Sequence, residues 1–230
     1  MKKTQLTLLV VLLLGFVTTI HAQRRARGIV PITNGIGIEG GMTQFDILTD
    51  NFETEAGNGW MLGGSATVDI PHKWYNVSYT IQLSENRVGI GASPIAASTM
   101  TEFVDYKMFT AQITLKAHVK LIQSYLTIDL GPMLQYNSEL ELREDRFENY
   151  FIRGYDNLLA KDITDISKFN FNGVIGISGG ISHFRLKAQY IYGFTNMLNK
   201  LNKNDLNVGS NTDKFKGNMS LFAVSLMISF

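Results

Sequence analysis

The side chains best suited to acid–base chemistry in this 230-residue sequence are its four histidines, His21, His72, His118 and His183. An imidazole can take a proton from a hydroxyl or a water and return it near neutral pH. None of the four belongs to a short motif that pairs it with a nucleophile, and the loop serines and aspartates form no recognisable triad. The sequence has no cysteine, which excludes thiol chemistry, disulfides and a lipid-modified cysteine.

The segment "DITD", Asp162 to Asp165, is a candidate for a calcium site. Calcium takes six to eight oxygen ligands, and two carboxylates in a polar stretch are better explained as a solvated loop. We therefore expect no metal and no cofactor.

A set of charged residues lies in stretches where apolar and polar residues alternate, always on the polar side. On a β-strand, alternate residues face opposite sides, so these charges would share one face. Three acids and four bases predict a mutually compensating network in an enclosed space, because buried charges persist when they are paired. A selective ion pathway lined by the same charges is the alternative. The residues are Glu39, Asp69, Lys116, Lys120, Asp129, Arg185 and Lys187.

The strands that must position these charges follow from the same alternation. In "YKMFTAQITLKAHVKL", apolar residues recur at every second position from Phe109 to Leu121, which predicts a strand rather than a helix. Similar runs predict eight strands in all. The other seven lie around residues 35–45, 60–70, 74–83, 125–136, 169–181, 184–195 and 218–230.

The connections between these strands alternate between long and short. Short turns lie at "PHK" and near Gln123 and His183, whereas long loops span about 13 residues after the first strand, then about 84–105, 137–168 and 196–216. This sorting is typical of transmembrane barrels, which place short turns on the periplasmic side, and a soluble sandwich or barrel has no reason for it. We predict an all-β, eight-stranded antiparallel transmembrane β-barrel. Aromatic residues such as Trp60, Trp74 and Tyr136 would face lipid instead of a soluble core.

Three segments carry a resemblance to a known family. "GGISHFRLKAQYIYGFTNML", "GIEGGMTQFDI" and "GWMLGGSATVDI" resemble the PorT-like family of small outer-membrane β-barrels, whose architecture is similar to that of eight-stranded OmpA/OmpX-type barrels. The resemblance implies a location in the outer membrane of a Gram-negative cell. It also implies an alternative function, as an accessory component of a protein secretion apparatus.

Both ends of the sequence fit this location. Residues 1–22, "MKKTQLTLLVVLLLGFVTTIHA", read as a signal peptide with a cationic start and a short apolar run; residues 23–34 would be a periplasmic segment and residues 35–230 the barrel. The final strand carries an alternating apolar row that ends in an aromatic residue. It resembles the signal read by the outer-membrane assembly machinery, and comprises Phe222, Val224, Leu226, Ile228 and Phe230.

The barrel also argues against an enzyme. Barrel enzymes of this size, such as lipid A acyl-modifying enzymes and outer-membrane proteases, typically use a histidine base near the outer rim. Here His21 would leave with the signal peptide, and the other three map to periplasmic turns or to the periplasmic half of a strand. We predict a non-enzymatic protein; a small pore or a lipid-modifying enzyme remain alternatives.

The longest loop is the remaining place for activity. In "RFENYFIRGYDNLLAKDI", apolar residues recur at helical spacing, which predicts an amphipathic helix that either packs over the barrel mouth or docks a protein partner. These residues are Phe147, Tyr150, Phe151, Tyr155, Leu158 and Leu159. The formal net charge of +1 does not indicate a nucleic-acid partner. We expect a monomeric barrel in outer-membrane lipid, with a structural or partner-binding role.

Overall fold

A computed structural model describes residues 32–96, 101–209 and 213–230. The predicted signal peptide and most of the predicted periplasmic segment therefore lie outside the described residues. Within the described ranges, no helix is long and apolar enough to cross a membrane.

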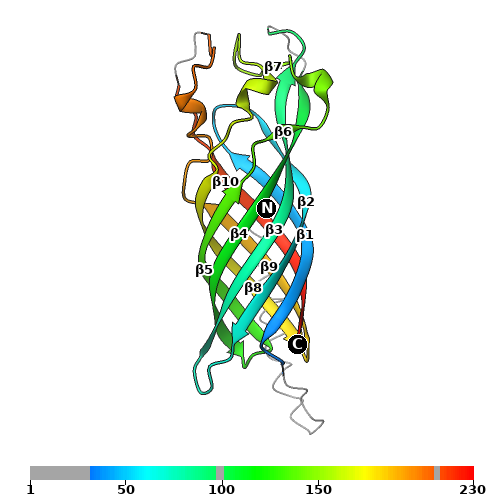
Figure 1. The fold of residues 1–230 in the computed structure, drawn as a ribbon, viewed down its shortest axis with the longest axis vertical. Coiled ribbons are helices and arrows are strands. Elements are labelled where there is room, and N and C mark those ends of the chain that lie inside the picture. Colours follow the sequence, from blue (N-terminus) through cyan, green and yellow to red (C-terminus); the bar gives the residue numbers. More distant parts are fainter. Residues whose placement is uncertain (1–31, 97–100, 210–212) are drawn as a thin grey trace, which may run out of the picture. The chain divides into compact units, whose positions relative to one another are not determined.

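Eight antiparallel strands form a closed ring in the order β1, β2, β3, β4, β5, β8, β9 and β10 (Figure 1). Closure is made by β10 pairing with β1, in a register that runs from Gly37 opposite Ser229 to Leu48 opposite Asn218. The predicted eight-stranded barrel is confirmed. The strands are β1 (Ile36–Leu48), β2 (Thr54–Val68), β3 (Tyr75–Ser93), β4 (Glu102–Ile122), β5 (Leu126–Asn137), β8 (Phe169–Ile181), β9 (Phe184–Gly193) and β10 (Asn218–Ser229).

The two faces of the strands differ as the alternation requires. On β10, Phe222 and Leu226 are exposed on the outer face, while Ser225 and Ser229 are buried inside. The same outward apolar row continues on the neighbouring strands, where Leu186, Tyr190, Ile38 and Met42 are exposed. In a closed ring every strand edge is paired, so the backbone can lie in hydrocarbon without unsatisfied polar groups.

Short turns join the strands at one end of the barrel. Each contains a non-glycine residue with positive φ: His72 at 62°, Gln123 at 49° and Ser182 at 54°. Such left-handed residues help the chain reverse direction; the connections span residues 69–74, 123–125 and 182–183. By the rule that short turns are periplasmic, this end faces the periplasm.

Two of the predicted long loops are shorter than expected. β2 begins at Thr54, so residues 49–53 suffice to connect it to β1, and β3 continues to Ser93 before β4 starts at Glu102. The first error arose because the register of β2 shifts between Ala56 and Trp60, which interrupts the alternation. The second arose because β3 and β4 continue beyond the band of apolar outward residues.

The extension of β3 and β4 is the framework of an extracellular lobe, which we define as described residues 86–96, 101–108, 138–168, 194–209 and 213–217. Two short strands add to it: β6 (Glu141–Leu142) pairs with β4, and β7 (Phe151–Ile152) pairs with β3. Three 3₁₀ turns complete it, η2 (Asp145–Phe147), η3 (Ala160–Ile163) and η4 (Leu201–Lys203). The predicted amphipathic helix is wrong, because the apolar residues pack in several directions around the extended hairpin.

The barrel interior changes character along its length. Towards the periplasm its inward residues are polar, among them Ser78, Gln82 and Lys116. Towards the lobe they are mixed: Ile47 and Met133 join the lobe in one hydrophobic cluster, while Asn86, Gln135 and Asn137 are buried and hydrogen-bonded to other polar side chains. The hydrogen-bonded polar lining therefore continues into the upper lumen, whereas the buried charges Glu39, Lys116 and Asp129 lie in its periplasmic part.

Candidate functional site

The polar interior is organised around Glu39 of β1, which is 1% exposed. Lys187 Nζ of β9 lies 2.5 Å from Glu39 Oε2, and Gln82 Nε2 of β3 donates to Glu39 Oε1 at 2.6 Å. Each contact joins strands that are not neighbours: β10 lies between β9 and β1, and β2 lies between β1 and β3. The contact between Glu39 and Gln82 requires a glycine at position 63 of β2, because a Cβ there would lie 2.7 Å from Cγ of Gln82.

A second hydrogen-bonded chain runs from β3 through β4 to β5. His118 Nε2 lies 2.7 Å from Ser78 Oγ, and His118 Nδ1 lies 2.7 Å from Asp129 Oδ1. Thr127 Oγ1 donates to the same Asp129 oxygen at 2.6 Å and lies 2.7 Å from Ser178 Oγ of β8. Polar side chains thus connect four consecutive strands of the ring.

The order hydroxyl, imidazole, carboxylate is that of a hydrolase triad. Here, however, Ser78 is 3% exposed, His118 4% and Asp129 0%. The narrow gap at this level, lined by His118 but not by Ser78, has a volume of about 0 Å³ for a water-sized molecule. The geometry brings the imidazole, the carboxylate and the hydroxyl together, but it leaves no room for a substrate beside the hydroxyl. These hydrogen-bonded side chains therefore connect neighbouring strands.

Arg185 of β9 also points into the polar interior, but it does not pair with a carboxylate. Its guanidinium donates to Ser178 Oγ at 3.3 Å and to the backbone oxygen of Ser124 at 3.1 Å. Within the predicted network of acids and bases, Arg185 therefore contacts a hydroxyl and a carbonyl oxygen instead of an acid.

Lys116 is the least satisfied of the predicted lumen charges. Its side chain is fully buried, and its Nζ has no hydrogen-bond acceptor among the described residues. It belongs to the same polar interior as Glu39 and Lys187 without contacting either.

The pair Asp69 and Lys120 lies at the periplasmic end instead of within the lumen. Lys120 Nζ is 3.2 Å from Asp69 Oδ1, and the Asp69 side chain is 50% exposed. Asp69 comes directly after the last residue of β2, Val68, so the alternation that would have turned it inward has ended. The expectation of a buried Asp69 is wrong.

Ser78, Thr127, Ser178 and Gln82 belong to these contacts without having been singled out in the sequence, and His118 was considered there only as a candidate base. His118 stands two positions after Lys116 on the polar side of the same alternating run, so its inward direction could have been read. Its partners could not, because they lie on other strands.

The predicted partner-loop residues build the lobe instead of forming an exposed apolar face. Phe147, Tyr155 and Leu158 are buried, and the remaining three are half-buried. Tyr155 stacks on Phe215 with ring centroids 5.8 Å apart, and Tyr106 of β4 donates to the backbone oxygen of Ala160 at 2.8 Å. Their apolar surface is therefore used to join the loops to the hairpin.

The "DITD" segment is held by neighbouring protein groups. Asp162 Oδ2 accepts a hydrogen bond from the backbone of Leu159 at 3.0 Å, while Asp165 accepts from Lys200 and Asn204. The hydrogen bond from Lys200 holds the pKa of Asp165 below its ordinary value of 3.8. Among the described side chains, no group of three or more His, Cys, Asp or Glu could hold a metal ion.

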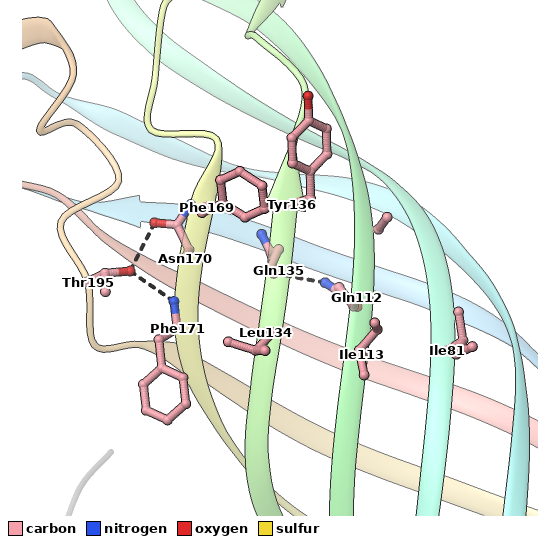
Figure 2. A pocket seen from close by; sticks show the side chains of 11 residues that line it. Ile81, Gln112, Ile113, Leu134, Gln135, Tyr136, Phe169, Asn170, Phe171 and Thr195 are labelled. Atoms are coloured by element: carbon pink, nitrogen blue, oxygen red, sulfur yellow. Dashed lines mark hydrogen bonds between the residues drawn. The ribbon is translucent and has the colours of Figure 1, made fainter.

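An apolar hollow of about 490 Å³ lies on the outer face of the barrel, across β3, β4, β5 and β8 (Figure 2). Ile81, Ile113 and Leu134 lie along one side, and Tyr136 and Phe169 along the other (Figure 2). This hollow was not predicted from the sequence, because it depends on side chains that four strands bring together.

The closed ring, the apolar outer face and the sorting of short turns and long loops are the combination found in bacterial outer-membrane proteins. The chain is an outer-membrane β-barrel. No family model matches the sequence, and no curated protein matches it.

Solved structures of small outer-membrane proteins share the general architecture. Neisserial surface protein A is 13% identical, with 86% of this chain and 98% of that chain covered, at a TM-score of 0.47. The attachment invasion locus protein Ail of Yersinia pestis, in complex with the heparin analogue sucrose octasulfate, is also 13% identical, with 86% and 100% covered, at a TM-score of 0.44.

Proposed function

We propose that this barrel is non-enzymatic and serves as a rigid carrier for its extracellular lobe, which has a structural or partner-binding role. The observation that carries the proposal is the shared hydrophobic cluster of lobe and upper barrel, in which Ile90 and Tyr106 of the hairpin, Leu158 of the long loop and Ile47 of β1 are fully buried. The apolar cluster covers the lobe end of the lumen, and hydrogen-bonded polar side chains cross the interior below it, among them Glu39 with Gln82 and His118 with Asp129. Both features support a closed barrel over an ion pathway.

Ion pairs on the outside of the lobe hold its parts together. Arg143 pairs with Asp105 at 3.2 Å, Arg153 with Glu53 at 3.6 Å and Lys107 with Glu141 at 2.9 Å. Each joins a loop to a strand or to the loop after β1. Exposed pairs contribute about 0 to 1 kcal/mol each, so their main effect is to restrict the loops. A preordered surface loses less conformational entropy when it binds.

Affinity purification from solubilised outer membranes tests the partner. We expect a stoichiometric cell-surface protein to co-purify with the wild type and to be lost with the charge reversals Arg143→Glu and Arg153→Glu, which leave the lobe core intact. Lys73→Glu, on the periplasmic turn, is the matched control and should keep the partner. Absence of any stoichiometric protein, or its equal recovery with all variants, would contradict partner binding by the lobe.

An accessory role in a secretion apparatus is the second candidate, supported by the resemblance of the β1, β2 and β9 segments to the PorT-like family. The same purification distinguishes it. Secretion components recovered in stoichiometric amounts, together with loss of export when the chain is deleted, would favour this role over a generic surface lobe.

We further propose that residues 1–22 are removed on export and that residues 23–34 lie in the periplasm. In support, Thr33 donates its backbone N–H to Ser182 at 2.9 Å, and Thr67 donates to Gly35 at 2.8 Å, so residues 33–35 lie beside the short turns. The mature protein should begin at Gln23, fractionate with outer membranes and migrate differently on gels when unheated. An intact leader in the membrane fraction would contradict the cleavage.

A further inference from the structure

The outer hollow has its floor at Ala111 of β4. In the strand register, Ala111 lies between Leu83 of β3 and Tyr136 of β5. All three positions face outward, so a methyl group stands between two large side chains. The resulting depression is bounded at the next outward position of β4 by Ile113.

The upper wall of the hollow is a pair of aromatic rings. Tyr136 and Phe169 meet edge to face with centroids 5.2 Å apart, and Phe171, whose ring centroid lies 5.9 Å from that of Phe194, closes a side. Aromatic contacts of this kind fix ring orientation. The walls are thus better defined than those of a surface covered with mobile aliphatic side chains.

The polar groups near the hollow are already satisfied. Thr195 Oγ1 accepts the backbone N–H of Phe171 at 3.1 Å and donates to Asn170 Oδ1 at 3.0 Å (Figure 2). Gln112 donates to Gln135 at 3.0 Å on the other side of the strands. The lining therefore offers mainly dispersion contacts, and its remaining polar group is the hydroxyl of Tyr136.

The level of the hollow along the barrel shows which part of the membrane surrounds it. One outward position above Ala111 is Phe109, which lies opposite Glu85, and beyond it stand the charged pairs Arg87–Glu85, Lys107–Glu141 and Lys168–Glu139. The hollow is continuous below with the apolar outer face at Ile81 and Leu134. It therefore opens into hydrocarbon just beneath the headgroups of the extracellular leaflet, where water is not available to fill it.

We propose that this hollow binds one acyl chain of a lipid A-type glycolipid, the phosphorylated lipid of that leaflet. A volume of about 490 Å³ is within the usual range for small-molecule sites, about 300 to 1,000 Å³. Lipid tails are as apolar as the outer face of the barrel, so the hydrophobic effect does not favour an acyl chain in the hollow over one elsewhere on the barrel. Van der Waals packing against side chains of fixed shape supplies the preference for the hollow. At the rim, Lys107 and Lys168 are 36% and 41% exposed and pair with Glu141 and Glu139, so the glycolipid phosphates would share these cations with the two carboxylates.

Native mass spectrometry of the purified barrel, incubated in detergent with hexa-acylated lipid A and an excess of phosphatidylethanolamine, tests the proposal. Ala111→Phe fills the floor of the hollow. Ala117→Phe makes the same change on the same outward face of β4, three outward positions lower and outside the lining. We expect one lipid A to remain bound to the wild type and to Ala117→Phe, and its affinity for Ala111→Phe to fall about tenfold, equivalent to about 1.4 kcal/mol.

A second variant tests the same hollow in case Ala111→Phe fails to fold. Phe169→Ala removes half of the aromatic wall at a side chain that is 78% exposed, so the barrel should keep its heat-dependent gel mobility while lipid A retention falls. Retention by both variants equal to that of the wild type would overturn the site. Equal retention of phosphatidylethanolamine and lipid A would overturn the assignment to lipid A.

Discussion

Lys187 of β9 and Glu39 of β1 meet inside the barrel with Nζ and Oε2 2.5 Å apart, and the strand between them is β10. The pair therefore spans the seam at which the last strand closes on the first. Side-chain pairing across a closing seam adds a link that the backbone ladder between β1 and β10 does not provide. We infer that it favours the closed register over shifted ones.

Replacing Lys187 with Met should destabilise the barrel by about 3 to 5 kcal/mol, because Glu39 would remain as a buried charge without its partner. Unfolding in urea, followed in detergent micelles, measures the change. The control is Lys168→Met, which removes one partner of a half-exposed pair with Glu139 and should cost about 0 to 1 kcal/mol.

Adding Glu39→Gln to Lys187→Met should recover part of the lost stability, because no carboxylate is then left without Lys187; the recovery is partial because the buried Lys116 loses the nearby charge of Glu39. Equal costs for Lys187→Met and Lys168→Met would show that the buried pair does not stabilise the seam.

His118→Ala should cost about 1 to 3 kcal/mol, because Asp129 and Ser78 both lose a buried hydrogen-bond partner. The matched control is His72→Asn in the first periplasmic turn, where asparagine tolerates the positive φ and we expect little change. The readout is again the urea midpoint. Unchanged stability of His118→Ala would remove it from the bracing chain.

Phe230→Ala should lower the amount of assembled protein in the outer membrane. The backbone N–H of Phe230 donates to Ile36 at 2.8 Å, and its ring extends the outward apolar row of β10. Phe184→Ala is the control: Phe184 is also an outward aromatic, pairs with Ile228 in the strand register and is 53% exposed. Heat-modifiable protein is measured on gels of membrane fractions, and similar levels of the two variants would count against an assembly signal.

The purified barrel should conduct no steady ion current in planar bilayers. Eight strands enclose a space that side chains nearly fill; here hydrogen-bonded polar side chains cross the interior and an apolar cluster covers its lobe end. Stable, ion-selective conductance of the wild type would contradict the closed lumen.

The lobe should loosen in acid. Because the pKa of Asp165 is lowered in the folded protein by the hydrogen bond from Lys200, its contribution to stability is fully present above its ordinary value of 3.8 and is lost as the pH falls through the folded value. Limited proteolysis of residues 194–209 with an acid-active protease should therefore accelerate at the lowest pH values. Asp165→Asn should be cleaved faster near neutral pH and show a weaker pH dependence; an unchanged pH profile would exclude Asp165 as a cause.

The strands of the membrane band could be read from the sequence because their signal is local. Apolar residues at every second position from Phe109 to Leu121 require an outward and an inward face, whatever the rest of the chain does. The same alternation also predicted that Lys116 and His118 point into the barrel and that the apolar residues of β10 point outward. The even strand number and the sorted connections then indicated closure.

The tertiary structure alone decided which inward residues meet. Contacts across a barrel depend on the stagger between strands, which leaves no mark in the alternation of any one strand. Glu39 therefore meets Lys187 over β10, and Asp129 meets His118, while Arg185 reaches a hydroxyl and Asp69 lies outside. The lobe differs from its sequence pattern for a related reason: the helical spacing from Phe147 to Leu159 is overridden because these side chains bury more apolar surface against the β3–β4 hairpin and neighbouring loops than one helical face could.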